Sequence, residues 1–113
     1  MRKSDKKIDN QIIKALTEVC QLALEDIDGF EWLTHSVNFD IFPASLKVIC
    51  VFDTNSKLAN YIASSNNLRL TSLITDSLAD IGIKIQDVKQ QVTLDSEENC
   101  TLHHDGNWRK RLS

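Results

Sequence analysis

The sequence predicts one α+β domain, in which a three-stranded mixed sheet carries its helices on one face. Three observations predict this class. Apolar residues recur with a helical period near the start and in the middle of the chain, strand-like runs lie between these segments, and a short apolar run follows the last helical pattern. The 113 residues, 42% of them hydrophobic, suffice for one domain that buries roughly two-thirds of its unfolded surface. The predicted element order is α-β-β-α-α-β.

The first predicted element is a helix over residues 8–27. Asp28 and Gly29 are expected to end it, because glycine adopts the left-handed conformation of a helix terminus at little cost. One face of this helix must pack against the rest of the domain, since apolar residues recur on it every three or four positions. These residues are Ile8, Ile12, Leu16, Val19, Ala23 and Ile27.

Two strands are predicted next. Val37, Phe39 and Ile41 alternate with polar or oppositely facing residues, as in a half-buried strand, and Pro43 ends this run. Residues 46–52, LKVICVF, are apolar on both faces except at Lys47, which is typical of a central buried strand. The tight turn at Pro43 makes these two strands antiparallel neighbours.

Two short helices and a last strand complete the prediction. Residues 53–56 offer four helix-capping side chains, and a helical pattern follows them. The polar joint at residues 64–67, SSNN, divides this pattern into two helices or kinks one long helix before Gly82. Ile83 begins the last predicted strand. Its apolar residues move from odd to even positions near Asp87, and this shift predicts a bulge that keeps the same face inward. This strand pairs in parallel with the central strand through a right-handed crossover.

The element order over residues 8–94 resembles the type II KH fold, a β-α-α-β core with a leading helix and strand. At the residue level, LKVICVFDTNSKLANYI followed by LRLTSLITDSLADIGIKIQDV is similar to the KH-like domain of the DciA-like helicase-loader family. The resemblance implies binding of single-stranded nucleic acid, which KH domains clamp with a GXXG loop. The joint at residues 64–67 has no glycine, so the resemblance favours the fold more than this binding mode.

A further resemblance is to small bacterial proteins labelled Fis-family transcriptional regulators. Fis proteins end in a helix-turn-helix, whereas this chain is predicted to end in a strand and a tail.

The predicted element order also sets the domain organisation. Residues 1–113 are expected to form one domain, with a KH-like core at 8–94 and a polar, basic C-terminal tail at 95–113.

Charge is distributed unevenly along the chain, whose net charge is −3. Residues 1–14 carry five Lys or Arg against two Asp, and residues 109–111 are all basic, so that each end has a charge of +3. Residues 15–108 hold five basic and fourteen acidic residues, a charge of −9. The acidic body counts against strong DNA binding, because affinity depends chiefly on phosphate neutralisation.

Metal and catalytic chemistry have little support. Cys100, His103, His104 and Asp105 are ligand types, but they supply at most three ligands for a structural zinc site that needs four. The sequence contains no Gly-x-Ser-x-Gly, His-Glu-x-x-His or phosphate-binding glycine loop. Asp53 is better explained as part of a helix cap. We therefore expect no metal, no cofactor and no enzymatic activity, and the three cysteines predict no disulfide framework.

The basic ends are the candidate binding residues. At the C-terminus an aromatic residue adjoins cations, which suits base stacking and phosphate contact. Alternatively, Trp108 and Leu112, four residues apart, dock one helical turn on the domain. The N-terminal cations either solubilise a helix start or act together with the tail. The candidates for nucleic-acid binding are Arg2, Lys3, Lys6, Lys7, Trp108, Arg109, Lys110 and Arg111.

These features favour a small cytoplasmic, non-enzymatic adaptor. Its basic termini are expected to bind single-stranded nucleic acid weakly, or to bind a nucleic-acid-processing protein. The alternative is a protein-interaction or dimerisation module, such as a homodimer, that uses Trp32, Trp108 or the exposed sheet face. No membrane partner is expected, because no apolar run approaches the ~20 residues of a membrane span and no signal-peptide core follows the basic start.

Overall fold

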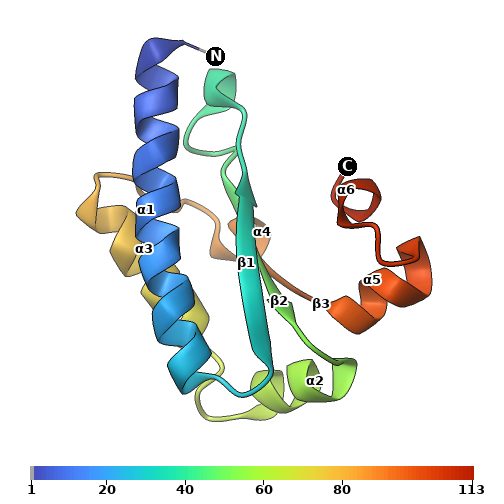
Figure 1. Cartoon of the computed structure of the whole chain (residues 1–113). Coiled ribbons are helices and arrows are strands. Elements are labelled where there is room, and N and C mark those ends of the chain that lie inside the picture. The colour runs from blue at the N-terminus through green and yellow to red at the C-terminus, as the bar shows by residue number, and fades with distance from the viewer. Residues whose placement is uncertain (1) are drawn as a thin grey trace.

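The structure is a computed structural model that describes residues 2–113. It confirms the predicted α+β class and adds helices at the C-terminal end (Figure 1). The helices are α1 (Lys3–Asp26), α2 (Asn55–Ala63), α3 (Arg69–Asp80), α4 (Val88–Gln91), α5 (Glu97–His104) and α6 (Trp108–Arg111), with a 3₁₀ turn η1 at Phe39–Ile41. The strands are β1 (Phe30–Ser36), β2 (Lys47–Phe52) and β3 (Val92–Ser96).

The sheet is mixed, with the order β1-β2-β3. β1 pairs with β2 in the antiparallel sense, and β3 pairs with β2 in the parallel sense, so the prediction of a central second strand is confirmed. Alternate residues of β2 point to opposite faces. Val48, Cys50 and Phe52 face the main core and have no exposed surface.

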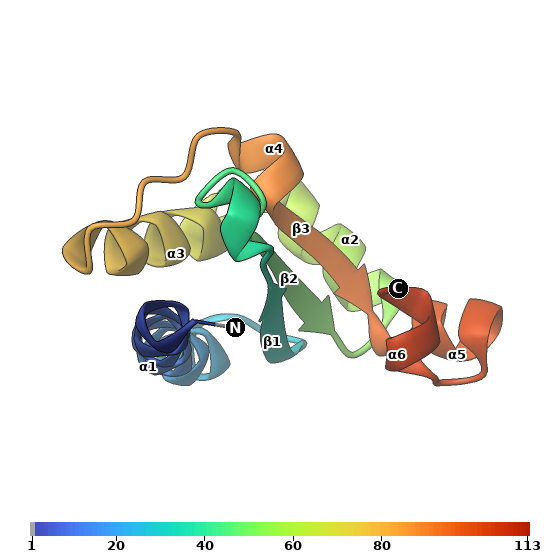
Figure 2. The ribbon, with the colours of Figure 1, turned by 90° about the horizontal axis from the view of Figure 1, so that it is seen from above.

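α1 and α3 cover this face of the sheet. Figure 2 shows them side by side on one side of the strands, with α5 and α6 on the other side. The apolar stripe of α1 packs inward as its spacing predicts, and Ile74 of α3 is likewise fully buried against it. No helix among residues 2–113 has the length and apolar character to cross a membrane.

The helix boundaries around the crossover follow the predicted capping residues. Thr54 caps α2 by accepting a hydrogen bond from the Lys57 amide. α2 and α3 are separate helices, because the polar side chains of the joint bond to the backbone instead of continuing the helix. Ser64 Oγ donates to the carbonyl of Tyr61, and the Asn67 amide donates to the carbonyl of Ile62.

The predicted strand at residues 37–42 is wrong, since β1 lies earlier, at Phe30–Ser36. Residues 37–46 form a turn that bonds within itself. The Asn38 side chain accepts from the Asp40 amide, and Ser45 Oγ donates to the Asn38 carbonyl. The alternating pattern therefore belongs to a folded turn that has no strand partner.

The last strand is shorter than predicted and begins at Val92 rather than at Ile83. In place of the predicted bulge near Asp87, the short helix α4 precedes β3. This helix accounts for the change in the apolar alternation between Ile83 and Val92. The side chain of Gln91, which is only 3% exposed, links the segment before α4 to the segment before β2. Its side-chain oxygen accepts from the Gln86 and Asp87 amides, and its nitrogen donates to the Pro43 and Leu46 carbonyls.

Gly29 lies in the turn between α1, which ends at Asp26, and β1, and it has φ +85°. An added Cβ would lie 2.5 Å from Lys57 Cβ, whereas Gly106, with φ +78°, has no atom within 4 Å of such a Cβ. We expect Gly29→Ala to lower the free energy of unfolding by about 1–3 kcal/mol, and by more than Gly106→Ala does. Urea denaturation of both variants measures this difference, and equal decreases would contradict the role of the Lys57 contact.

Candidate nucleic-acid interface

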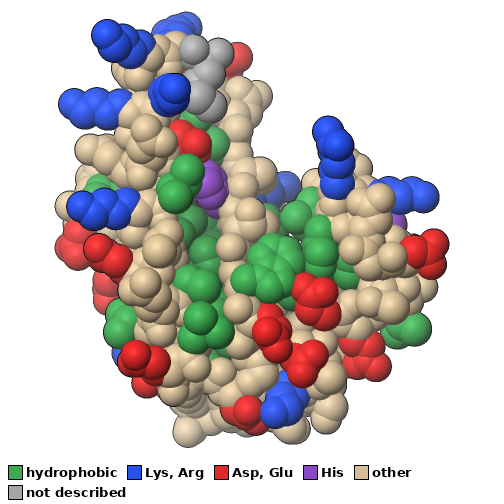
Figure 3. Space-filling model, in the orientation of Figure 1, with side chains coloured by type: hydrophobic (Ala, Val, Ile, Leu, Met, Phe, Trp, Pro, Cys, Tyr) green, Lys and Arg blue, Asp and Glu red, His purple; other side chains and the backbone are tan. Residues whose placement is uncertain are grey.

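The predicted N-terminal candidates lie on the first turns of α1. Lys3, Lys6 and Lys7 are exposed there, and Lys14 joins them two turns further along. These four residues, named here the lysine stripe, surround a shallow surface hollow of about 430 Å³ together with Asn10 and Gln11. In Figure 3 the basic side chains gather at this end of α1. Arg2, at the N-cap, is also exposed.

The lysine stripe has no carboxylate partner among residues 2–113. The two aspartates of this half of α1 are engaged elsewhere. Asp5 accepts a hydrogen bond from the Arg2 backbone amide, and Asp9 lies 2.8 Å from Nε2 of His35. Lys3 and Lys14 are about 16 Å apart along the helix axis, a length over which a nucleic-acid strand presents several phosphates.

Trp108, predicted either to stack on a base or to dock on the domain, is docked. Its ring meets the ring of Trp32 edge to face, with the centroids 4.9 Å apart. Both indole nitrogens donate to the same oxygen of Glu97, at 2.6 Å from Trp32 and 3.2 Å from Trp108. Base stacking by Trp108 would require its ring to leave Trp32 and Glu97.

Arg111 is also engaged within the domain. It donates two hydrogen bonds to the carboxylate of Asp95, at 2.6 and 3.0 Å, and both side chains are less than one-fifth exposed. Burial alone would raise the pKa of Asp95. The hydrogen bonds from Arg111 and from the Ser96 amide outweigh this effect and hold the pKa below its ordinary value.

The positions of Trp108 and Arg111 explain why the last helix folds onto the sheet. Trp32, Val51 and Asp95 lie in one row across the second face of the sheet. Trp108 and Arg111 are three residues apart on α6 and contact the two ends of this row. Val51 between them has no exposed surface. Of the four C-terminal candidates, only Arg109 and Lys110 are exposed.

The ligand-type residues of the C-terminal segment do not converge. Cys100 is buried in α5, while His103 and Asp105 are exposed. His104 Nδ1 lies 3.3 Å from Arg111. Between residues 2 and 113 there is no group of three or more His, Cys, Asp or Glu side chains that could hold a metal ion.

Two features of the surface were missed by the sequence reasoning. Lys14 belongs to the lysine stripe, and its position seven residues after Lys7, on the same side of a helix, could have revealed it. An apolar groove of about 360 Å³ also lies between α1 and β1. No sequence signal indicated this groove, because β1 was predicted at other residues.

Comparison with known protein families, with curated proteins and with solved structures gives no match.

Replacement of Trp108 tests the docking of α6. We expect Trp108→Ala to lower the free energy of unfolding by about 1–3 kcal/mol, because it removes the aromatic contact and uncovers Val51. Arg109→Ala, on the exposed side of the same helix, is the control and should change it by less than about 0.5 kcal/mol. Urea denaturation followed by circular dichroism measures both, and a neutral Trp108→Ala would show that α6 is not docked in solution.

The pair of Arg111 and Asp95 predicts a dependence of stability on pH. Because the pKa of Asp95 is lowered in the folded state, its stabilising effect is present above the ordinary aspartate pKa of about 3.9 and disappears as the pH falls below it. Arg111→Gln removes the charged partner, so the stability of this variant should fall less than that of the wild type between about pH 5 and pH 3. Urea midpoints across this range measure the difference, and parallel curves would contradict the assignment.

Proposed function

We propose that this protein is a small, non-enzymatic cytoplasmic adaptor that binds single-stranded nucleic acid weakly, with the lysine stripe of α1 as its main contact. The observation that carries this proposal is the exposure of four lysines around one hollow, with no ion pair to carboxylates of residues 2–113. Lysines without internal partners are available to neutralise phosphates. Arg2 extends the same surface at the helix start.

Arg109 and Lys110 provide a second, smaller basic surface. They project from α6 on the side away from the Trp108 and Arg111 contacts. Figure 3 shows basic side chains over both the start of α1 and α6, and acidic side chains over much of the opposite end of this face. Because the remaining surface is largely acidic, binding should be local, weak and sensitive to salt.

The resemblance to type II KH domains and to the DciA-like family stays part of the proposal, with a different contact surface. The joint at residues 64–67 has no glycine, and its Ser64 and Asn67 side chains bond to the backbone of α2. Such a joint offers no close approach for a phosphate backbone. We therefore propose the lysine stripe, and not the joint at residues 64–67, as the phosphate contact.

Charge reversal tests the proposal. The variant Lys3→Glu/Lys7→Glu/Lys14→Glu should bind a fluorescein-labelled single-stranded oligonucleotide at least about tenfold more weakly than the wild type, because it replaces three of the four lysines of the stripe by carboxylates. The slope of log affinity against log salt should also flatten by up to about 2, at ~0.7 for each phosphate that the variant no longer neutralises. Fluorescence anisotropy at several salt concentrations measures both quantities.

The matched control is Lys47→Glu/Lys84→Glu/Lys89→Glu, which reverses the same number of exposed lysines outside the stripe. This control should reduce affinity much less than the triple variant does. Equal reductions would mean that only the net charge matters, and an absence of salt-dependent binding by the wild type would reject the nucleic-acid function altogether.

A further inference from the structure

A second hollow lies at the start of α1, between this helix and the turn that follows β1. Its volume is about 390 Å³, which falls within the range of small-ligand sites, about 300–1,000 Å³. Figure 1 shows the turn beside the N-terminal end of the helix. The lining residues are Arg2 and Asp5 from the start of the helix, and Val37, Asn38, Phe39 and Asp40 from the turn. The phosphate contact proposed above does not account for this hollow.

The lining of the hollow matches both the face and the edge of a nucleobase. Phe39 is partly buried, and its ring packs against the ring of Phe42, with the centroids 5.5 Å apart. Together with Val37, Phe39 supplies an apolar surface on which a base can stack. The carboxylates of Asp5 and Asp40 supply acceptors for the amino groups of base edges.

The charges of the hollow favour a base over a phosphate. Arg2 carries one positive charge, and Asp5 and Asp40 carry two negative charges, so the lining has a net charge of −1. The carboxylate of Asp40 is exposed and forms no ion pair among residues 2–113. Such a lining repels a phosphate, whereas a base is uncharged and can donate its amino hydrogens to a carboxylate.

The hollow adjoins the lysine stripe at the start of α1. Asp5 of the hollow precedes Lys6 of the stripe by one residue, so the two surfaces occupy neighbouring sides of the helix, about 100° apart around its axis. For a helix about 10–12 Å across, this angle corresponds to roughly 10 Å along the surface. A single strand whose phosphates lie on the stripe crosses this distance within a few nucleotides and can place a base in the hollow.

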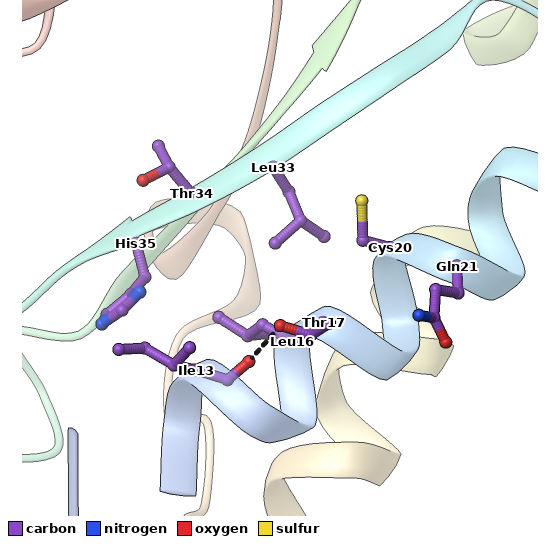
Figure 4. Close-up of a pocket in the computed structure, with 8 residues that line it drawn as sticks. All are labelled: Ile13, Leu16, Thr17, Cys20, Gln21, Leu33, Thr34 and His35. Atoms are coloured by element: carbon purple, nitrogen blue, oxygen red, sulfur yellow. Dashed lines mark hydrogen bonds between the residues drawn. The ribbon is translucent and has the colours of Figure 1, made fainter. Parts of the chain in front are cut away.

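The groove between α1 and β1 does not extend this site. It lies further along the helix, beyond the pair of Asp9 and His35, which stands between the groove and the hollow. In Figure 4, Leu33 points from β1 toward α1, where Ile13 and Leu16 line the groove from the helix. No carboxylate lines the groove. Base edges therefore find acceptors in the hollow and not in the groove.

We propose that the hollow binds one base of the single strand whose phosphates lie on the lysine stripe, and that it prefers bases with an amino group, namely adenine, cytosine and guanine. This proposal rests on the nucleic-acid function proposed above and adds a base preference to it. The base stacks on Phe39, and the carboxylate of Asp40 accepts a hydrogen bond from its amino group. Thymine and uracil have no amino group, and their carbonyl oxygens are repelled by a carboxylate.

Two homo-oligonucleotides of equal length, one of deoxycytidine and one of thymidine, test the preference with the full-length protein. Both are pyrimidine strands with the same number of phosphates, so the lysine stripe contributes equally to their binding. The wild type should bind oligo(dC) at least about fivefold more tightly than oligo(dT), which is the lower limit for discrimination by one good base contact. Fluorescence anisotropy with labelled oligonucleotides measures both affinities.

The variant Asp40→Asn tests the proposed acceptor. An amide donates as well as accepts, so the affinities of this variant for the two oligonucleotides should differ by less than about twofold. Asp76→Asn is the matched control, because Asp76 is exposed on α3 and lies outside the hollow. This control removes the same charge and should keep the preference of the wild type.

The variant Phe39→Ala tests the stacking surface. It should bind oligo(dC) at least about fivefold more weakly than the wild type, because base–aromatic stacking is lost. Ile41→Ala is the control in the same turn, since Ile41 is 61% exposed and does not line the hollow, and it should bind normally. Thermal melting shows whether both variants fold, and Asp40→Asn decides the question if Phe39→Ala does not.

The outcomes separate the base site from the nucleic-acid function. Equal affinity of the wild type for the two oligonucleotides, an unchanged preference in Asp40→Asn or normal binding by folded Phe39→Ala would overturn the base site. Salt-dependent binding that persists in these cases leaves the lysine stripe as the phosphate contact. An absence of salt-dependent binding by the wild type would overturn both proposals.

Discussion

Burial of both faces of β2 is the constraint on which the rest of the structure depends. Val48, Cys50 and Phe52 need a cover on one face, which α1 and α3 provide with their apolar stripes. Val51 needs a cover on the other face, where the sheet has no large helix. Since an uncovered apolar strand is costly in water, the C-terminal segment has to return to the sheet. This requirement explains why a polar segment folds into two short helices.

The return of the C-terminal segment depends on polar contacts more than on apolar area. Glu97 accepts from both tryptophans, and Asp95 binds Arg111, so the partners of α6 come from β3, α5 and β1 together. These contacts remove two of the candidate residues from the surface available to a ligand. The charge that remains available is mostly on α1, which shifts the proposed binding surface from the chain ends to the lysine stripe.

The sequence by itself determined the α+β class, α1 with its stop before Gly29, the central strand and the two crossover helices, because these depend on local periodicity and capping. It also identified the basic ends. Only the tertiary structure decided where β1 and β3 begin, since strand limits depend on which backbone groups find partners across the sheet. It alone decided that Trp108 and Arg111 are docked, because Trp32, which is far away along the chain, and Asp95 meet them only after the sheet has formed.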